Sequence, residues 1–574
     1  MIKDDKFNIL LVNDGKHYEV PFLMRLGDFS KENCKAVKDG KSGAEYPVLA
    51  ALVDHKLKEL DYRLTIAHEV EFIGYNHPDG RRTYLRSLCF VLQNAVRELF
   101  PSKVLIIDHS LPSGLYCTIC EAKLQEDGRR TNVKLSKEDL DSIRKRMHEI
   151  VNSDMPFNKV KTDAAIAEKI FEENNQPDKA ELVRSLGKFI CSVYYLDGKA
   201  DSFHGPLLPS TGYLKVFDLI PFADGFCLQF PSEGDFNKVI PVKSQSKIAA
   251  TLGRYSDWCS IIRINGIGTL NKAITSGHAV DLINMSEALH EREYAAIADQ
   301  IYARRNQVKA VFIAGPSSSG KTSSSLRIAL QCRVLGLVPK VIELDNYFVD
   351  REHTPKDSDG NYDFEALEAM DLKLLNSQLN DLFAGKEVEL PRFDFKAGRS
   401  VPSGKCISLG EKEILIMEGI HALDPAMVPE VDNSRIFRVY ASALTSLNVD
   451  ENNNISTSDN RLLRRMVRDN RVRGITPEET INRWYSVRRG ENRNIFPFQE
   501  NADASFNSAL IYELPMLKYY AEPLLRRIAP SSPAYTEAVR LLKFLDYIVA
   551  LSPDEISAIP PTSIMREFIG GQRL

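Results

Sequence analysis

One stretch of eight residues constrains the fold more than any other feature of this chain. Residues 315–322 read Gly-Pro-Ser-Ser-Ser-Gly-Lys-Thr, which fits the pattern G-x-x-x-x-G-K-[ST], and an apolar run at 310–314 precedes them. Glycines let such a loop turn several backbone N–H groups toward one point, and the helix that follows adds partial positive charge there. The pattern therefore predicts a phosphate-binding loop between a strand and a helix. A serine- and glycine-rich turn without a ligand is the alternative.

Two residues of this loop have specific predicted tasks. Lys321 would neutralise oxygens of the β- and γ-phosphates of a nucleotide, and Thr322 would ligate Mg²⁺. The predicted nucleotide-binding residues are Gly315, Pro316, Ser317, Ser318, Ser319, Gly320, Lys321, Thr322 and Ser323.

Four apolar runs have the length and composition of buried strands. They lie at residues 310–314, 340–344, 413–417 and 435–440, and helical or loop segments separate them. This order predicts a parallel sheet flanked by helices, in which ligands bind beyond the carboxyl ends of the strands.

Carboxylates directly follow two of these predicted strands. Asp345 follows the run at 340–344, and Glu418 follows the run at 413–417. Both would lie on the same edge of the sheet as the phosphate loop. One carboxylate could accept a proton from a substrate hydroxyl, while the other orders Mg²⁺. Capping of a helix is the alternative role for each residue.

The segment 461–493 is rich in arginine. It contains ten arginines and four acidic residues, a net charge of +6 by subtraction, in a chain whose net charge is −4. Arg461, Arg464, Arg465 and Arg468 recur three and four positions apart, so several of them share one helical face. Arginines that close over a transferred phosphoryl group would stabilise its transition state. A solvated basic face or an RNA-contacting face is the alternative.

Composition limits the class of protein. At about 100–200 residues per domain, 574 residues predict about three to five domains. A 43% apolar content with 26% charged residues argues against a collagen, a long coiled coil or a largely disordered chain. The 74 basic and 78 acidic residues give no global attraction to nucleic acid or membranes. Nine dispersed cysteines and the lack of a secretory signal at the start favour a cytoplasmic location with reduced thiols, and no membrane partner is expected.

Six ordered motifs carry a resemblance. PSSSGKT, LDNYF, NYDFEALEAMD, LPRFDF, MEGI and RLLRRMVRDNRVRG, between about 305 and 510, resemble the uridine kinase/phosphoribulokinase family. The resemblance implies a P-loop nucleoside kinase fold. It further implies transfer of the γ-phosphoryl group of ATP or GTP, with Mg²⁺, to the ribose 5′-hydroxyl of a nucleoside, as in pyrimidine salvage.

The resemblance also implies roles for individual residues. Asp345 matches the catalytic base, Asp363 the carboxylate that binds ribose hydroxyls, and Glu418 the Walker-B-like acid that joins Thr322 at the metal. Phe393 stands where an aromatic residue holds the base. The lid helix of the family corresponds to the segment that contains Arg464, Arg465, Arg468 and Asp469. With Lys321, the three arginines complete the predicted catalytic set, and the predicted substrate contacts are Asp345, Tyr347, Asp363, Phe393 and Arg399.

The segment after LPRFDF departs from the family pattern. Lys396-Ala397-Gly398-Arg399 stands where the nucleoside kinases usually carry a histidine, and Phe393 replaces a tyrosine. Two groups that would hydrogen-bond to the edge of a base are therefore absent, and such bonds discriminate strongly between substrates. Uridine is thus the family default, and another sugar or a small alcohol stays open as the acceptor.

The N-terminal half resembles other proteins. Residues 1–75 resemble a ubiquitin-like TGS domain, and residues 76–230 resemble the second N-terminal domain of threonyl-tRNA synthetase. The metal-binding HxxxH and CxxxH pairs of that domain align with Arg86, Phe90, Phe203 and Leu207. None of these four side chains supplies the imidazole or thiolate that a zinc-type site needs. The prediction is a retained fold without metal-dependent editing, and Cys117-x-x-Cys120 is interpreted as ordinary thiols.

These observations predict a multidomain α/β and α+β chain. The predicted division is a TGS-like domain (1–75), a synthetase-like domain (76–230), a connecting segment (231–285), a P-loop kinase domain with a parallel sheet (286–510) and a C-terminal helical extension (511–574). The leading hypothesis is a nucleoside kinase. An RNA- or ribosome-linked nucleotide-binding regulator, acting through the N-terminal domains, is the alternative from another class. A homo-oligomer is left open.

Overall fold

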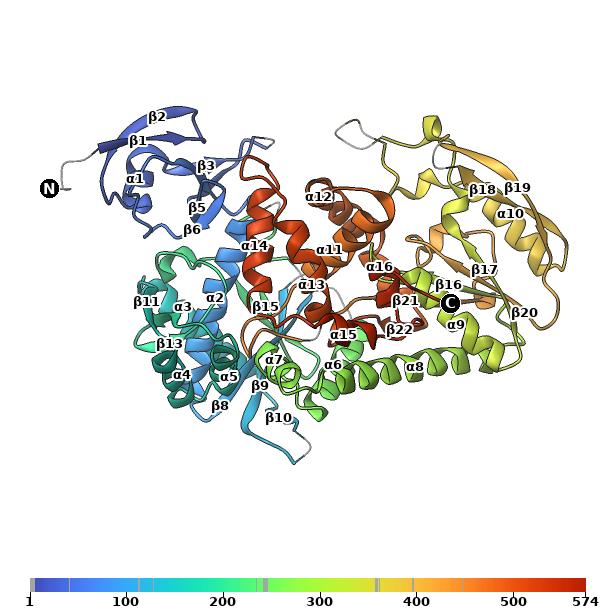
Figure 1. Cartoon of the computed structure of the whole chain (residues 1–574), viewed down its shortest axis with the longest axis horizontal. Coiled ribbons are helices and arrows are strands. Elements are labelled where there is room, and N and C mark those ends of the chain that lie inside the picture. The colour runs from blue at the N-terminus through green and yellow to red at the C-terminus, as the bar shows by residue number, and fades with distance from the viewer. Residues whose placement is uncertain are drawn as a thin grey trace.

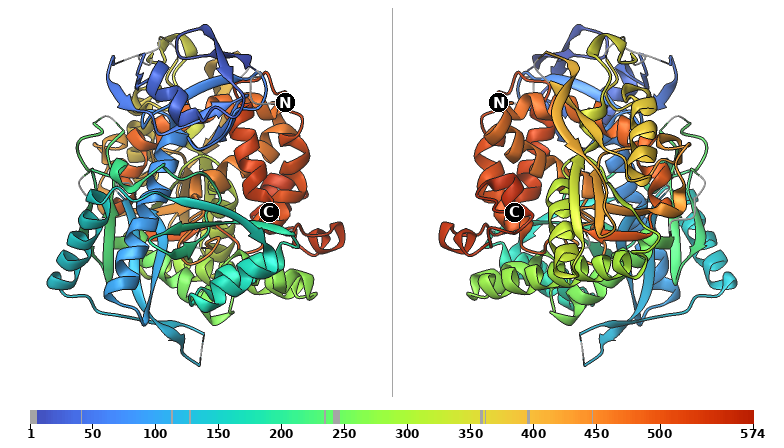
Figure 2. Two further views of the ribbon diagram at one scale, coloured as in Figure 1. Left: turned by 90° about the vertical axis from the view of Figure 1, so that its left-hand side faces the viewer. Right: turned by 90° about the vertical axis from the view of Figure 1, so that its right-hand side faces the viewer.

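The computed structural model describes residues 6–40, 42–111, 114–126, 128–233, 235–240, 246–356, 360, 362–394, 397–445 and 447–574. In Figure 1 the N-terminal units lie on the left, a parallel sheet lies on the right, and the C-terminal helices, in red, lie between them. The side views of Figure 2 show the N-terminal units in front from one side and the parallel sheet in front from the other. Within these described ranges, no helix is both long enough and apolar enough to cross a membrane.

The first unit is a five-stranded sheet that packs on one helix. Its elements are β1 (Lys6–Leu11), β2 (Lys16–Pro21), α1 (Leu26–Asn33), β3 (Ala36–Lys38), β4 (Glu45–Pro47), β5 (Ala50–Val53), β6 (Lys56–Lys58) and β7 (Glu69–Ile73). The strand order is β2-β1-β7-β5-β6. The segment 48–60, whose type the sequence leaves open, contains the hairpin of β5 and β6. Asp54 and His55 close it with φ values of 47° and 60°, which a tight hairpin turn of this kind requires.

The second unit is built around one long helix, α2 (Pro78–Leu99). The side chain of His77 caps it by accepting from the N–H of Asp79, and Pro78 occupies the first helical position, where its missing N–H costs nothing. The apolar residues between 85 and 100 recur three and four positions apart, which predicts a helix there, and the structure confirms it with an earlier start. Its apolar stripe, Leu88, Val91, Leu92, Ala95 and Val96, is buried.

Two small sheets and three helices surround α2. They are β8 (Lys103–Leu111), β9 (Gly114–Leu124), β10 (Arg130–Asn132), α3 (Lys137–Asn152), β11 (Asn158–Asp163), α4 (Ala164–Glu173), α5 (Pro177–Ser185), β12 (Ile190–Leu196), β13 (Lys199–Asp201), β14 (Asp218–Phe222) and β15 (Gly225–Gln229). The strand predicted at 104–109 lies in β8. The segment 181–196 is helical first and extended later, as its composition predicts.

The third unit contains the parallel sheet. Its strands are β16 (Ala310–Ala314), β17 (Val338–Glu343), β20 (Glu413–Glu418), β21 (Ile436–Ser442) and β22 (Ala504–Asn507). The order is β17-β20-β16-β21-β22, and every pair is parallel. The predicted parallel sheet is therefore confirmed, and each of the four predicted strands is present. Their buried, apolar composition is typical of a sheet covered on both faces.

Helices and one hairpin cover this sheet. They are α6 (Ser246–Ile261), α8 (Ala279–Ala303), α9 (Lys321–Val334), α10 (Leu372–Phe383), and the antiparallel strands β18 (Val388–Asp394) and β19 (Arg399–Ile407). Helix α7 (Ile267–Thr275) follows α6 but packs in the core of the later helices. Residues 231–285, predicted as a connection, thus contain two complete helices. The sequence pattern places the start of helix α8 at residue 286, but the helix begins earlier, at Ala279.

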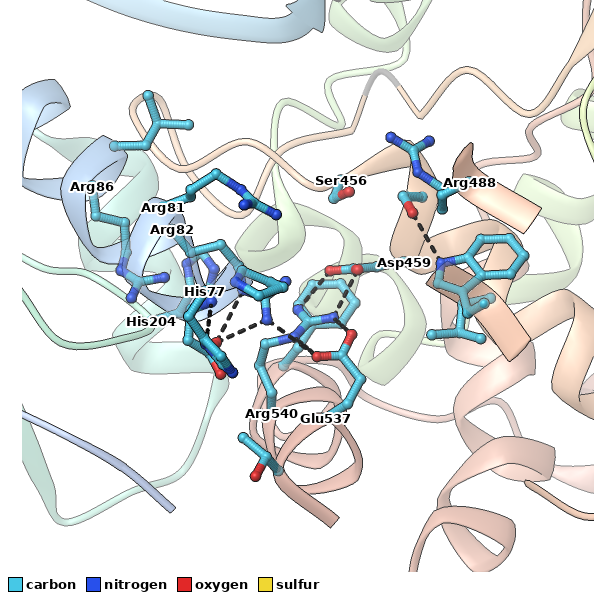
Figure 3. Close-up of a pocket in the computed structure, with 18 of the residues that line it drawn as sticks. His77, Arg81, Arg82, Arg86, His204, Ser456, Asp459, Arg488, Glu537 and Arg540 are labelled. Atoms are coloured by element: carbon cyan, nitrogen blue, oxygen red, sulfur yellow. Dashed lines mark hydrogen bonds and ion pairs between the residues drawn. The ribbon is translucent and has the colours of Figure 1, made fainter. Parts of the chain in front are cut away.

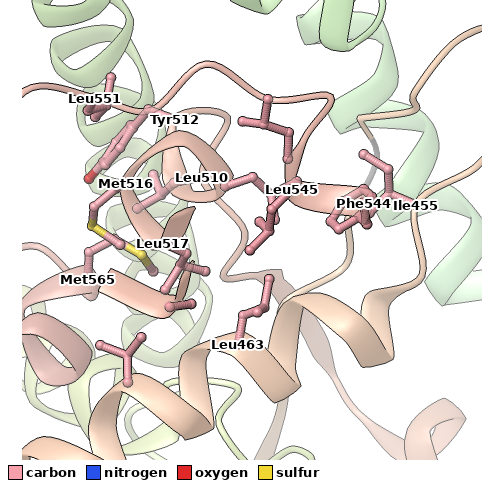
Figure 4. Close-up of a cluster of buried hydrophobic side chains, with 14 of the residues drawn as sticks. Ile455, Leu463, Leu510, Tyr512, Met516, Leu517, Phe544, Leu545, Leu551 and Met565 are labelled. Atoms are coloured by element: carbon pink, nitrogen blue, oxygen red, sulfur yellow. The ribbon is translucent and has the colours of Figure 1, made fainter. Parts of the chain in front are cut away.

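The remaining helices form a separate layer with its own core. They are α11 (Thr457–Arg468), α12 (Pro477–Asn494), α13 (Glu513–Leu525), α14 (Tyr535–Leu545), α15 (Pro553–Ser557) and α16 (Met565–Ile569). Figure 4 shows Leu463 of α11 packed among Leu517, Leu545 and Met565 of the later helices. The prediction of a helical tail after residue 511 is confirmed. The tail completes the core under α11 and α12 rather than standing apart from it.

One loop of the third unit is inserted into the second unit. We call residues 447–455 the asparagine loop. Lys179 of α5 is fully buried there, 2.9 Å from Asp450 and 3.0 Å from Asp201. The side-chain amides of Asn448 and Asn452 donate to the backbone carbonyls of β8. The two units are therefore joined by buried polar contacts as well as by the chain itself.

Candidate functional site

The phosphate loop connects β16 to α9, as its sequence pattern predicts. Gly315 passes so close to β21 that a Cβ would collide with the carbonyl oxygen of Ala441, and Gly320 has φ of +80°. Ser318 also adopts a positive φ, of 59°. The hydroxyl groups of Ser318 and Ser319 are buried, and neither has a hydrogen-bond partner in the described part of the chain. Unpartnered buried donors in such a loop fit the oxygens of a phosphate group.

Lys321 and Thr322 open helix α9. Among the described residues, the Lys321 ammonium makes a single long contact, 3.4 Å to the carbonyl oxygen of Pro316. The Thr322 hydroxyl donates to the Glu418 carboxylate at the end of β20, over 2.6 Å. This pair joins a hydroxyl and a carboxylate, the oxygen ligands that Mg²⁺ prefers. The residues thus fit the predicted metal position.

Three carboxylates gather at the carboxyl ends of β17 and β20. Burial raises the pKa of Asp345, Glu418 and Glu343, and the positive charge of Lys321 opposes this shift at the first two. Asp345 itself is accessible to solvent. A carboxylate with a raised pKa and an open path to a ligand is suited to take up a proton.

A fourth carboxylate of this site, Glu365, is not among the residues predicted from the sequence. Burial raises the pKa of Glu365 to about 7, and the charges of Glu491, Lys321, Arg465 and Asp345 all act on it. Glu365 belongs to the same NYDFEALEAMD motif as the predicted sugar ligand, and that motif was the available signal.

The predicted sugar ligand faces an arginine. A carboxylate oxygen of Asp363 lies 3.6 Å from the guanidinium of Arg493 on α12, and its other oxygen accepts from the N–H of Glu365. The Asp363 side chain is partly exposed. It is therefore available to a ligand that enters between this loop and α12.

The other predicted substrate contacts do not all face open space. Tyr347 is buried, and its hydroxyl donates to the side chain of Gln378. Phe393 is also buried, in edge-to-face contact with Phe348. Arg399 is exposed at the start of β19. Of these three residues, only Arg399 offers an exposed side chain to a substrate, and Lys396 lies outside the described residues.

Helix α11, the predicted lid helix, holds its arginines in two different ways. Arg465 donates to the hydroxyl of Ser317 over 2.8 Å, and Arg468 pairs with Asp469 over 3.1 Å. Asp469 is buried and also lies within ion-pair distance of Arg465 and Arg473. One carboxylate thus orients three guanidinium groups beside the phosphate loop.

Arg461 and Arg464 lie beneath the loop instead. Arg464 is fully buried, pairs with Glu513 and donates to the backbone of Ser508. This corrects the expectation that Arg464 closes over a transferred phosphoryl group, because Glu513 occupies its guanidinium. Arg461 is buried against Glu491, which also excludes it from a solvated or RNA-contacting face.

The C-terminal segment 562–572 contacts the phosphate loop directly. The hydroxyl of Ser323 donates to the Glu567 carboxylate over 2.6 Å, and the amide of Gln572 donates to the same hydroxyl. A Cβ on Gly320 would collide with the side chain of Ile564. No motif in this segment indicated such a role, because the contact joins residues 244 positions apart.

Comparison with known proteins decides the family. The model of the phosphoribulokinase / uridine kinase family matches residues 310–512. A uridine kinase of Macrococcus caseolyticus is 32% identical over 192 residues, which are 33% of this chain and 84% of that protein. The chain belongs to the phosphoribulokinase/uridine kinase family. The matched part of this family member contains the phosphate loop, Asp345, Asp363, Glu418 and α11.

The N-terminal region of this family member matches threonine–tRNA ligases. The ligase of Carboxydothermus hydrogenoformans is 28% identical over 179 residues, which are 31% of this chain and 27% of the ligase. That of Rubrobacter xylanophilus is 29% identical over 213 residues, 37% of this chain and 30% of the ligase. The chain therefore spans less than a third of the length of these two relatives.

A solved structure of D-glycerate 3-kinase from Cryptococcus neoformans is similar to part of the chain. The identity is 14%, the TM-score is 0.26, and the match covers 37% of this chain and 89% of the solved chain. This likeness is too weak to bear on function.

The four positions aligned with synthetase metal ligands lie together in the second unit. Phe90 and Phe203 are buried with ring centroids 5.3 Å apart, and Leu207 is buried beside them. The Arg86 guanidinium donates to the carbonyl oxygen of Pro206. In the described part of the chain, the one cluster with metal-ligand spacing is Asp350, Glu352 and His353, far along the sequence from this unit.

The thiols of Cys117 and Cys120 are both buried and free. Burial raises the pKa of each thiol, which makes it a poor nucleophile at neutral pH. Both residues lie on β9, as core or near-core side chains of the second unit.

Proposed function

We propose that the chain is a kinase that transfers the γ-phosphoryl group of ATP to the 5′-hydroxyl of a uridine- or cytidine-type nucleoside. The observation that supports this most is the placement of Asp345, Glu418 and Asp363 around the phosphate loop. Family membership supports the phosphoryl-transfer chemistry. GTP is the alternative donor, and the proposed place of action is pyrimidine salvage in the cytoplasm.

In this proposal the phosphate loop binds and orients the donor. The backbone N–H groups, the hydroxyls of Ser318 and Ser319, and the Lys321 ammonium would contact phosphate oxygens. Thr322 and Glu418 would hold Mg²⁺, which supplies positive charge to the β- and γ-phosphates when it is bound. Because Lys321 has only one long contact, it can reach a phosphate without breaking an ion pair.

Asp345 acts on the acceptor. Its carboxylate would accept the proton of the acceptor hydroxyl as the new O–P bond forms, while Asp363 orients the sugar through its hydroxyls. Arg465, held by Asp469, would stabilise the charge on the transferred group. The bonds of Arg465 and Glu491 to Ser317 place the lid helices against the loop, which limits the entry of water.

A different acceptor is the second candidate, and the hairpin β18–β19 favours it. Phe393 is buried, and Arg399 is exposed next to it in a segment without the usual histidine. A cationic side chain at this position suits an acceptor that carries negative charge or several hydroxyls. A sugar or small alcohol is therefore kept as the alternative.

The experiment is phosphoryl transfer from labelled ATP to a panel of nucleosides, sugars and small alcohols. Labelled 5′-monophosphate formed from pyrimidine nucleosides, and lost in Asp345→Asn, would support the proposal. Glu343→Gln is the matched control, because it removes a neighbouring carboxylate two residues earlier. Transfer to a sugar alone would favour the second candidate. Absence of any acceptor-dependent transfer would contradict both and favour a nucleotide-binding regulator.

The division of the chain is part of the proposal. We infer a TGS-like domain at 1–75, a synthetase-like domain at 76–230, a connection at 231–285, a kinase domain at 286–510 and a helical extension at 511–574. The extent of the first sheet and of the parallel sheet supports these limits.

A further inference from the structure

One cavity of about 800 Å³ lies between three parts of the molecule. Its walls come from α2 of the second unit, from α11 and α12 beside the phosphate loop, and from α14 of the tail. Figure 3 shows Arg81, Arg82, Arg86 and His204 on one side and Ser456 and Arg488 on the other. The volume falls in the range of about 300–1,000 Å³ that is typical of sites for small organic ligands.

Most arginines around this cavity already have a carboxylate partner. Arg540 pairs with Asp459 and Glu537 over 2.7 and 2.6 Å, and Arg82 pairs with Asp79 and Glu537 over 2.8 and 3.2 Å. Arg81 and Arg488 also have carboxylate partners. Within each of these ion pairs the arginine and carboxylate charges cancel, so the pairs do not by themselves attract a charged ligand.

Arg86 differs from these arginines. It donates to the carbonyl oxygen of Pro206 and to the hydroxyl of Thr83, and no carboxylate of the described chain lies within ion-pair distance. Its guanidinium packs on Gly205, where a Cβ would lie 2.6 Å from the central carbon. Burial lowers the pKa of Arg86 to about 10. A desolvated guanidinium without a counter-charge is costly, and an oxyanion would offset that cost.

Two further groups in the cavity wall favour an anion or a hydrogen-bonding ligand. The buried Nδ1 atom of His204 has no hydrogen-bond partner among the described residues. Ser456 is the N-cap of α11, but its side chain makes no capping bond. The positive end of this twelve-residue helix is thus open to the cavity. Leu85, Ile455 and other apolar side chains also line the cavity.

We propose that this cavity is a second ligand site, which binds a small organic molecule that carries a phosphate or carboxylate group on Arg86. The fork of the guanidinium matches two oxygens of either group. The apolar side chains between Arg86 and the start of α11 would contact the rest of the molecule.

The cavity wall is continuous with residues that hold the phosphate loop. Trp484 lines the cavity and lies under Arg461, which donates to the carbonyl oxygen of Ser317. Arg488 lines it too, and lies 3.7 Å from Glu491, which accepts from the N–H of Ser317. A molecule in the cavity would therefore contact Trp484 and Arg488, whose neighbours Arg461 and Glu491 bond to the phosphate loop.

The test is calorimetric titration of the full-length protein with inorganic phosphate, uridine 5′-monophosphate and succinate. A non-hydrolysable ATP analogue and a pyrimidine nucleoside, both at saturation, keep the phosphate loop and the proposed acceptor site filled, so that binding at these two places does not contribute. We expect saturable binding of a phosphate or a carboxylate probe, weakened at least about tenfold in Arg86→Gln. The three probes distinguish a phosphate ester, free phosphate and a carboxylate.

Arg97→Gln is the matched control. Arg97 lies on the same helix and donates to a backbone carbonyl, but it does not line the cavity. Gly205→Ala is a second variant that keeps Arg86 and displaces its guanidinium, and it decides the question if Arg86→Gln does not fold. The proposal is overturned if no probe binds saturably up to about 10 mM. It is also overturned if the affinity is unchanged in whichever of Arg86→Gln and Gly205→Ala folds.

Discussion

At the scale of single residues, the site is defined by carboxylates whose surroundings disfavour their charge. Asp345, Glu418, Glu343 and Glu365 all have raised pKa values, with burial as the largest cause. Lys321 lies among them without a carboxylate partner at ion-pair distance in the described residues. These carboxylates and Lys321 together bind a cation and a phosphate more readily than they bind either ligand alone, because the cation and the phosphate neutralise each other's charge.

The raised pKa of Asp345 predicts how activity depends on pH. The base must be ionised, so activity is present above its pKa and is lost as the pH falls through it. Because burial raises this pKa above the ordinary 3.8, we expect kcat/KM to decline at a higher pH than a free aspartate would give. A profile of kcat/KM against pH measures this.

At pH values above the pKa of Asp345, Asp345→Asn should lower kcat by about 10²–10⁴. Glu343→Gln should keep most of the turnover and shift the acid limb of the profile to lower pH, because the charge of Glu343 helps to raise the pKa of Asp345. A folded Asp345→Asn protein with near-normal turnover would remove this residue from the role of base.

At the scale of elements, the parts of the fold that depend only on residues close together in the chain could be predicted from the sequence. The phosphate loop and the strands around it were predictable, because a motif and apolar runs specify them within a few residues. The hairpin at 48–60 was not, since its apolar spacing fits both a helix and strands, and only its turn decides between them.

Roles that depend on distant partners were not predictable in this way. Arg464 and Arg465 are neighbours in one helix, yet Glu513 buries the first while Ser317 holds the second beside the loop. The pattern of arginines does not distinguish these positions. It is the packing of α13 against α11 that does so.

The contact of the C-terminal segment with α9 predicts a measurable effect on nucleotide binding. Glu567→Gln removes the negative charge of a carboxylate that accepts a hydrogen bond from Ser323 and lies 3.7 Å from Arg468. We expect ATP-analogue affinity to fall by roughly three- to thirtyfold, the effect of weakening one charge-assisted hydrogen bond near the loop.

Glu555→Gln is the control for this prediction, because Glu555 caps the preceding helix α15 and, among the described residues, makes no hydrogen bond to the phosphate loop. Equal affinities in the wild type and both variants would show that the segment only covers the loop.

At the scale of the whole molecule, the asparagine loop and α14 join the units through charges. Lys179→Met leaves Asp201 and Asp450 buried without their cation. We expect a loss of about 3–5 kcal/mol in the free energy of unfolding, measured by chemical denaturation. Lys199→Met removes a half-exposed partner of Glu98 and should cost about 1 kcal/mol or less. Similar losses in both variants would contradict the prediction.

The ion pairs of Glu537 with Arg82 and Arg540 predict how low pH weakens the contact between the units. Burial alone would raise the pKa of Glu537, but the two arginines outweigh it and hold the pKa at about 2. A depressed pKa stabilises the folded chain above the ordinary value of 4.5, and this contribution is lost as the pH falls toward 2.

We therefore expect the midpoint of urea unfolding to fall between pH 4.5 and 2 in the wild type. Glu537→Gln should be less stable at pH 7 and should show a shallower decline over that interval. Parallel curves for the two proteins would exclude Glu537 as a contributor.

The bond between Ser323 and Glu567 has a consequence for the protein during its synthesis. The two residues are 244 positions apart, so a ribosome that adds about 5–20 residues per second makes Glu567 about 12–50 s after Ser323. Throughout that interval the growing chain has its phosphate loop but lacks the segment that contacts it. A nascent chain would therefore acquire its full affinity for nucleotide late, after the synthetase-like and kinase-like parts have both emerged.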